Sequence, residues 1–142
     1  MLRKSAIALM AVVMVMALVT TAGAHPLLEE YEGQVDEMDV MDLQMDLDMG
    51  VDYLVLDVRT PEERAEGYIP DSTFTNFGTL FFRIEDYVED QEEEFIVSCQ
   101  SGARSLIAAK LLQDMGYENV INLEGGFLAW EEAGYEVEYP EE

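Results

Sequence analysis

A six-residue segment combines the residue types needed for nucleophilic chemistry on an anion. It reads Cys99-Gln100-Ser101-Gly102-Ala103-Arg104, and it holds the single cysteine of the chain. Thiolates are strong nucleophiles, and the planar arginine group suits oxyanions. We therefore expect a catalytic Cys99 with Arg104 binding the anion. The other interpretation is a buried core cysteine, which we disfavour because four small or polar residues follow it.

The segment follows a predicted strand at residues 95–98 and precedes the clearest predicted helix, at 103–115. Backbone amides at a helix N-terminus point at an anion, and the helix dipole adds positive charge. We expect this field to favour a thiolate at Cys99.

Strands and helices alternate along the chain, which predicts an α/β fold with a mainly parallel central sheet flanked by helices on both faces. Strands are predicted at 54–58, 95–98 and 120–123, with a weaker one at 73–77 and an edge strand at 31–35. Helices are predicted at 39–49, 61–64, 79–88, 103–115 and 126–132. Thr60 and Glu63 form a capping box for the second helix. Asp57 and Arg59 lie at the end of another strand and should therefore face the same sheet edge as Cys99.

Four ordered motifs resemble those of rhodanese-type sulfurtransferases, over roughly residues 31–137. The first is the C-x-x-G-x-R pattern at 99–104. Residues 56–63 resemble L-D-V-R-x-x-x-E, residues 67–72 resemble G-H-I-P-G-A, and residues 123–130 resemble L-x-G-G-x-x-x-W. The resemblance implies a rhodanese-like fold for a single domain at residues 25–142.

The resemblance also implies an activity. Cys99 would take sulfane sulfur from thiosulfate, a persulfide or a polysulfide and hold it as a cysteine persulfide. It would then pass the sulfur to a thiol or to cyanide. The reaction would need no metal or organic cofactor. Arg104 would hold the donor oxygens. The negative charge of the persulfide would be held by the loop amides of Gln100, Ser101, Gly102, Ala103, Arg104 and Ser105. Arg59 would face the donor or support the site, and Asp57 would orient the loop or touch substrate.

Three departures from the family pattern bear on the donor. Gln100 replaces a residue that is basic in many relatives, Tyr68 replaces the usual histidine, and Asp71-Ser72 replaces Gly-Ala. We therefore expect thiosulfate to be a poor donor and a persulfide or polysulfide to be preferred. One alternative is a non-catalytic rhodanese-like module that binds a protein partner. A phosphatase or arsenate reductase is disfavoured, because those relatives resemble this fold with a seven-residue loop.

The composition excludes several classes of function. The chain has 31 acidic and 7 basic residues, a net charge of −24. This balance argues against nucleic acid and against anionic membrane surfaces. With 49% hydrophobic residues the chain should fold as a compact domain. One cysteine and one histidine permit no internal disulfide and disfavour a zinc site.

Residues 1–24 are typical of a cleaved signal peptide. Arg3 and Lys4 precede an apolar run at 6–19, and small residues at 22–24 suit a peptidase. We expect export to the periplasm, cell envelope or medium, without stable membrane association after cleavage. An uncleaved membrane anchor is the alternative. Cleavage would leave five basic against 31 acidic residues, or −26.

Two further patterns concern the rest of the chain. Met38, Met41, Met45 and Met49 recur at helical spacing. We expect this stripe to pack in the core rather than to bind copper through its thioethers. Lys110 is the only lysine after residue 24. Many acids with almost no lysine favour a protein adapted to strong salt.

Overall fold

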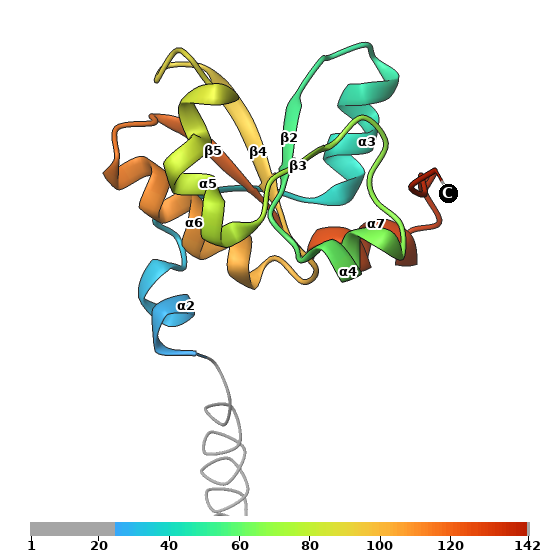
Figure 1. Ribbon diagram of the computed structural model, residues 1–142, viewed down its shortest axis with the longest axis horizontal. Coiled ribbons are helices and arrows are strands. Elements are labelled where there is room, and N and C mark those ends of the chain that lie inside the picture. The colour runs from blue at the N-terminus through green and yellow to red at the C-terminus, as the bar shows by residue number, and fades with distance from the viewer. Residues whose placement is uncertain (1–24, 142) are drawn as a thin grey trace, which may run out of the picture.

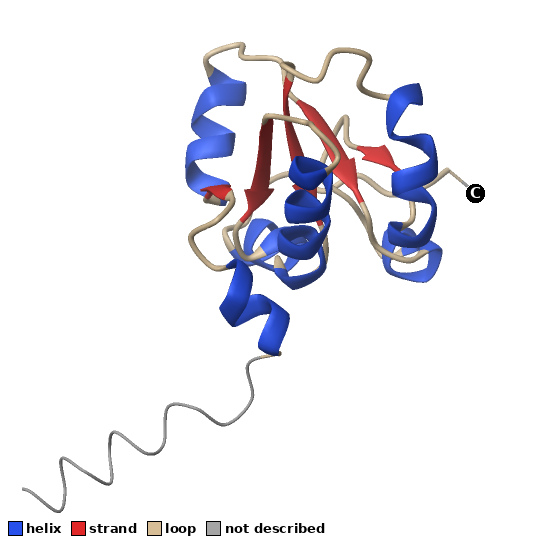
Figure 2. Ribbon diagram, turned by 90° about the vertical axis from the view of Figure 1, so that its left-hand side faces the viewer, coloured by secondary structure: helices blue, strands red, loops and turns tan. Residues whose placement is uncertain are grey.

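Five parallel strands form the centre of the molecule, in the order β1-β5-β4-β2-β3 (Figures 1 and 2). The structure is a computed structural model that describes residues 25–141, so the predicted signal peptide lies outside the described residues. The strands are β1 (Asp36–Met38), β2 (Leu54–Asp57), β3 (Thr73–Phe74), β4 (Glu94–Ser98) and β5 (Asn119–Leu123). The α/β fold with a mainly parallel sheet is confirmed.

The sheet is buried on both faces because its central strands are apolar at successive positions. Phe95 and Val97 of β4 join one core cluster, and Ile96 joins the other. Helices α2 (Pro26–Tyr31), α5 (Phe77–Arg83) and α6 (Ala103–Asp114), with the 3₁₀ turn η1 (Ile84–Asp86), contribute to the first cluster. Helices α3 (Val40–Asp48) and α7 (Gly126–Glu132) contribute to the second. Continuous apolar strands are expected where helices cover both faces.

The parallel arrangement brings the carboxyl ends of the central strands to one edge. Leu56 pairs with Val97, Asp57 with Ser98, and Val97 in turn with Asn122. The loops that follow β2, β4 and β5 therefore start side by side, as is usual for sites of parallel α/β sheets. Helix α4 (Pro61–Ala65) follows β2 at this edge.

Most element boundaries agree with the sequence prediction, and the α4 capping box between Thr60 and Glu63 is present. The predicted helix at 79–88 is instead two elements, α5 and η1. The edge strand predicted at 31–35 is wrong, because Tyr31 ends helix α2 and the edge strand β1 begins at Asp36. Gly33, at φ +75°, turns the chain between the two.

The prediction that the methionine stripe packs in the core is also wrong for most of its members. Met41, Met45 and Met49 are 64%, 54% and 69% exposed. Helix α3 packs instead through Val40 and Leu43, which are buried. The core face is therefore set by the Val40 and Leu43 positions, and the methionines lie beside it.

Residues 25–141 contain no helix that is long and apolar enough to cross a membrane. Within the same range, His, Cys, Asp and Glu side chains form no group of three or more suited to a metal ion.

Candidate active site

The segment at residues 99–104, here called the cysteine loop, places the only thiol of the chain just before α6. Cys99 is fully buried, and its Sγ accepts hydrogen bonds from the Gly102 N–H at 3.1 Å and the Ser105 hydroxyl at 3.3 Å. Gly102 precedes α6 in a left-handed conformation, at φ 90°, which lets its N–H turn back toward the sulfur. Two donors and the helix dipole therefore converge on this sulfur, an arrangement that stabilises negative charge.

The turn between β5 and α7 holds the backbone carbonyls of the cysteine loop in place. The N–H groups of Phe127 and Leu128, in the first turn of α7, donate to the carbonyls of Cys99 and Gln100 at 2.9 and 3.0 Å. A Cβ on Gly126 would lie 2.4 Å from the Cys99 carbonyl oxygen, and Gly126 has φ +57°. Glycine is therefore required here for both space and conformation.

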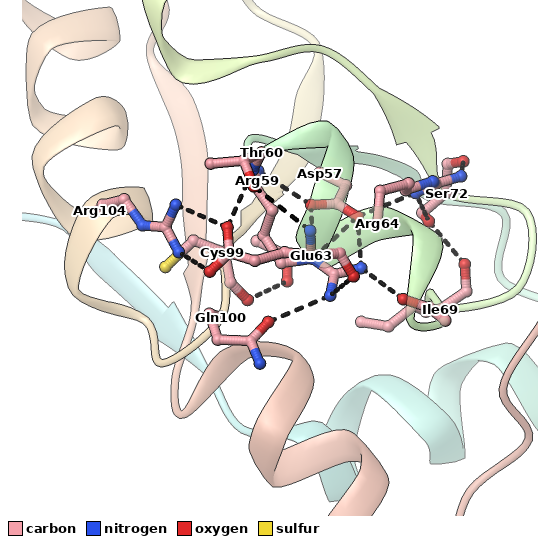
Figure 3. A network of polar contacts seen from close by, with 12 residues as sticks. Asp57, Arg59, Thr60, Glu63, Arg64, Ile69, Ser72, Cys99, Gln100 and Arg104 are labelled. Carbon is pink, nitrogen blue, oxygen red and sulfur yellow. Dashed lines mark hydrogen bonds and ion pairs between the residues drawn. The ribbon is translucent and has the colours of Figure 1, made fainter.

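Arg59 connects the cysteine loop to the segment after β2 (Figure 3). Its Nε and Nη2 donate to the Asp57 carboxylate, and Nη2 also donates to the Gly67 carbonyl at 2.7 Å. Its Nη1 donates to the Glu63 carbonyl and to the Gln100 side-chain oxygen, both at 3.1 Å. The residue is only 1% exposed, so a full set of bonds compensates its buried charge.

The Asp57 carboxylate also binds a second arginine. Arg64 donates to it at 2.9 Å and holds Ser72 through both its hydroxyl and its carbonyl. The Tyr68 ring stacks on the Arg64 guanidinium, with 3.6 Å between the guanidinium carbon and the ring centroid. Asp71 has φ 59°, a left-handed conformation at the position where the resembled motif has glycine. The departures at 68 and 72 thus belong to a network that supports the sheet edge.

Arg104 forms a bidentate ion pair with Glu63 of α4. The two nitrogen–oxygen distances are 2.9 and 2.6 Å. The bond from Arg104 is the main reason that the pKa of Glu63 falls from 4.5 to about 2. The same bond is the main reason that the pKa of Arg104 is raised, and the nearby Cys99 contributes less. The predicted anion-binding arginine is therefore already paired.

Comparisons with known proteins agree with this geometry. The family model of the rhodanese-like domain matches residues 40–133. The chain belongs to the rhodanese-like domain family. A sulfurtransferase of Allochromatium vinosum is 36% identical over 107 residues, which cover 75% of this chain and 98% of the relative.

Solved structures show the same fold. A rhodanese-like domain protein of Staphylococcus aureus superposes with a TM-score of 0.66 at 28% identity, covering 75% of this chain and all of that one. A protein of unknown function from Rhodopseudomonas palustris, described as a possible tyrosine phosphatase, gives a TM-score of 0.72 at 34% identity. It matches 84% of this chain and 97% of its own length. The predicted rhodanese-like fold is thereby confirmed.

The rhodanese-like domain brings together most of the predicted site residues. Cys99, Gly102 and Ser105 meet at the sulfur, and Gln100 turns its side chain to Arg59. Arg59 faces the interior, so it supports the site and does not face a donor.

The remaining predicted residues lie around this centre. Asp57 is buried and accepts bonds from two arginines, which fits the loop-supporting role and not contact with substrate. Ser101 is exposed, and Ala103 begins α6 half-buried. Arg104 is bound to Glu63, so it is not free to meet an anion without competition.

Several residues that shape the site were not predicted as part of it. Glu63 was assigned only to a capping box, and the resembled L-D-V-R-x-x-x-E motif, which ends at Glu63, is the signal that could have indicated its role. Gly126 and Phe127 belong to the paired-glycine motif, and the Phe127 ring lies 4.3 Å from the Arg59 guanidinium. Arg64 is separated from its partner Asp57 by seven positions, so only the fold brings the two together.

Proposed function

We propose that this chain is a sulfurtransferase that carries sulfane sulfur on Cys99 as a persulfide. The observation that carries the proposal is the Cys99 sulfur itself, which accepts bonds from Gly102 and Ser105 at the N-terminus of α6. Relatives named sulfurtransferase support the same enzyme class. The donor would be thiosulfate, a persulfide or a polysulfide, and the acceptor a thiol or cyanide.

The reaction proceeds in two displacement steps. The Cys99 thiolate attacks the outer sulfur of the donor, the donor's S–S bond breaks, and sulfite or a thiolate leaves with the electron pair. A thiol or cyanide then attacks the outer sulfur of the persulfide and regenerates the Cys99 thiolate. Sulfur passes between the two partners without net oxidation, so the cycle needs no electron acceptor.

The chain's own groups have definite roles in this cycle. The Gly102 N–H and the Ser105 hydroxyl stabilise negative charge on the Cys99 sulfur before attack and on the persulfide afterwards. The first turn of α7 holds the loop carbonyls of Cys99 and Gln100, which keeps the amide donors in place.

Intact mass spectrometry tests the proposal directly. Incubation with thiosulfate or an organic persulfide should add the mass of one sulfur atom, and a following incubation with cyanide should remove it. Because the chain has one cysteine, the site of addition is unambiguous. Cys99→Ser is the control and should gain no sulfur. Absence of the adduct with every sulfane donor would contradict the proposal and would favour a non-catalytic module.

The Rhodopseudomonas palustris structure makes phosphatase activity the second candidate. Hydrolysis of p-nitrophenyl phosphate tests it. We expect none, because the six-residue loop is held tightly against α7 and a tetrahedral phosphate needs a wider ring. Cys99-dependent turnover would overturn that expectation.

We further propose that residues 1–24 are removed on export. The support is the sequence pattern of two basic residues, an apolar run and small residues at 22–24. N-terminal sequencing of exported protein should start at His25. Retention of residue 1 would favour a membrane anchor.

A further inference from the structure

The Glu63–Arg104 ion pair connects two elements of the active site that lie far apart in sequence. Glu63 belongs to α4 and Arg104 to α6, and the two are 41 positions apart. Figure 3 shows the two planar groups facing each other beside Cys99. The two side chains are 27% and 37% exposed, so the pair is held at the margin between the interior and solvent. Bidentate arginine–carboxylate pairs are among the strongest in proteins.

This pairing offsets the positive charge of Arg104, which lies close enough to Cys99 to interact with it electrostatically. Arg104 would otherwise be the cation that attracts an anionic donor to Cys99. The other basic residues in the described range offer no replacement, because each is also paired with a carboxylate. Arg59 and Arg64 pair with Asp57, Arg83 with Asp86, and Lys110 with Asp114.

We propose that Glu63 is a specificity-determining residue that selects sulfane donors carrying at most one negative charge, such as persulfides, over dianionic thiosulfate. The inference rests on the proposed sulfur transfer and names its donor class. A dianion must either displace the Glu63 carboxylate from Arg104 or bind beside that carboxylate and be repelled by it. A donor with less charge meets a smaller repulsion, and the loop amides suffice to hold it.

With a protonated persulfide as donor, the loading of Cys99 balances in atoms and charge. The Cys99 thiolate attacks the outer sulfur of R–S–SH, and the S–S bond of that donor breaks. The products are the Cys99 persulfide, which keeps the proton, and the thiolate R–S⁻, which leaves with the electron pair. With thiosulfate the leaving group is the sulfite dianion, which departs beside the same Glu63 carboxylate.

Two donors that differ by one charge test the selection. Thiosulfate and methanethiosulfonate both carry a sulfane sulfur on an oxidised sulfur, but the second is a monoanion. The measurement is kcat/KM for sulfur transfer to cyanide with each donor. Glu63→Gln keeps the length and hydrogen-bonding capacity of the side chain, so the capping box with Thr60 can persist without the charge.

We expect Glu63→Gln to raise kcat/KM for thiosulfate about tenfold relative to that for methanethiosulfonate, the factor given by about 1.4 kcal/mol of removed repulsion. Glu62→Gln is the matched control, because it removes the same charge from the same exposed helix without touching Arg104. Glu63→Asp, which keeps the charge, should stay at the wild-type ratio. An unchanged ratio in Glu63→Gln would overturn the inference.

A measurement on the unmodified chain keeps the test independent of any variant. Methanesulfonate and sulfate are unreactive tetrahedral ions with one and two negative charges. Methanesulfonate should inhibit sulfur transfer at lower concentration than sulfate, and the reverse order would contradict the inference. If no sulfane donor, an organic persulfide included, loads Cys99, the proposed function itself fails, whereas loading without charge selection overturns only the role of Glu63.

Discussion

Replacement of Gly126 by alanine tests whether the α7 turn sets the geometry of the nucleophile. The added Cβ would lie 2.4 Å from the Cys99 carbonyl oxygen, so the loop must retreat by about 1 Å to reach the ordinary contact distance. A misplacement of about 1 Å in a catalytic group costs roughly a hundredfold in rate. Alanine at φ +57° also costs about 1–2 kcal/mol, and the crowding adds about 1–3 kcal/mol.

Gly134 provides the matched control for this substitution. It has φ +79° but nothing within 4 Å of its Cβ position, so Gly134→Ala carries the conformational cost without the collision. Sulfur loading of Cys99, followed by quenched intact mass spectrometry, should be about a hundredfold slower in Gly126→Ala and close to wild type in Gly134→Ala. Urea unfolding should show the larger destabilisation in Gly126→Ala. Loading of Gly126→Ala within about threefold of wild type would refute the reasoning, since the loop would then tolerate the displacement.

Three further predictions concern charge. Asp57→Asn removes the carboxylate that Arg59 and Arg64 share. Because two arginines lose their counter-charge, the free energy of unfolding measured in urea should fall by about 3 kcal/mol or more. A decrease below about 1 kcal/mol would contradict the stabilising role of this buried network. Glu63 has a lower pKa in the folded chain than its ordinary 4.5, so its stabilising effect is complete above that pH and is lost as the pH falls toward about 2. The wild type should exceed Glu63→Gln by about 2 kcal/mol in unfolding free energy at neutral pH, and a gap that does not narrow in acid would contradict this cause. The net charge of −24 makes the acidic side chains repel one another. The melting temperature should therefore rise between low salt and 1 M KCl, as the screening length falls from about 10 Å or more to about 3 Å. A melting temperature that does not change with salt would contradict the hypothesis of salt adaptation.

The central elements could be predicted from sequence because their signals are local. The apolar run at 54–58, the run at 95–98 and the capping box at Thr60 each specify their own element, and the structure has β2, β4 and α4 there. The edge strand could not be placed, since β1 has three residues and depends on pairing with β5. The exposed methionines were mistaken for a core stripe because they recur at helical spacing, as do Val40 and Leu43, which form the buried face of the same helix.

At the site, the sequence singled out Cys99 as the candidate nucleophile but did not indicate how its neighbours are paired. Cys99 and its loop stand out by residue type and by position before a helix. The pairing of Arg104 with Glu63 depends on how α4 and α6 meet at the sheet edge, which no short pattern encodes. In the same way, the burial of Arg59 follows from partners at Gly67 and Gln100 that only the tertiary fold supplies.

The bonds of Arg59 have a consequence for how the active-site edge opens. One side chain binds β2 through Asp57, the start of α4 through Glu63, the turn at Gly67 and the cysteine loop through Gln100. None of these segments can detach without breaking bonds that also restrain the others, so the edge forms one cooperative opening unit. Backbone amides in the four segments should therefore exchange their hydrogens together. In the proposed cycle, a sulfur carried on Cys99 would be protected from solvent oxidants by the stability of that whole unit.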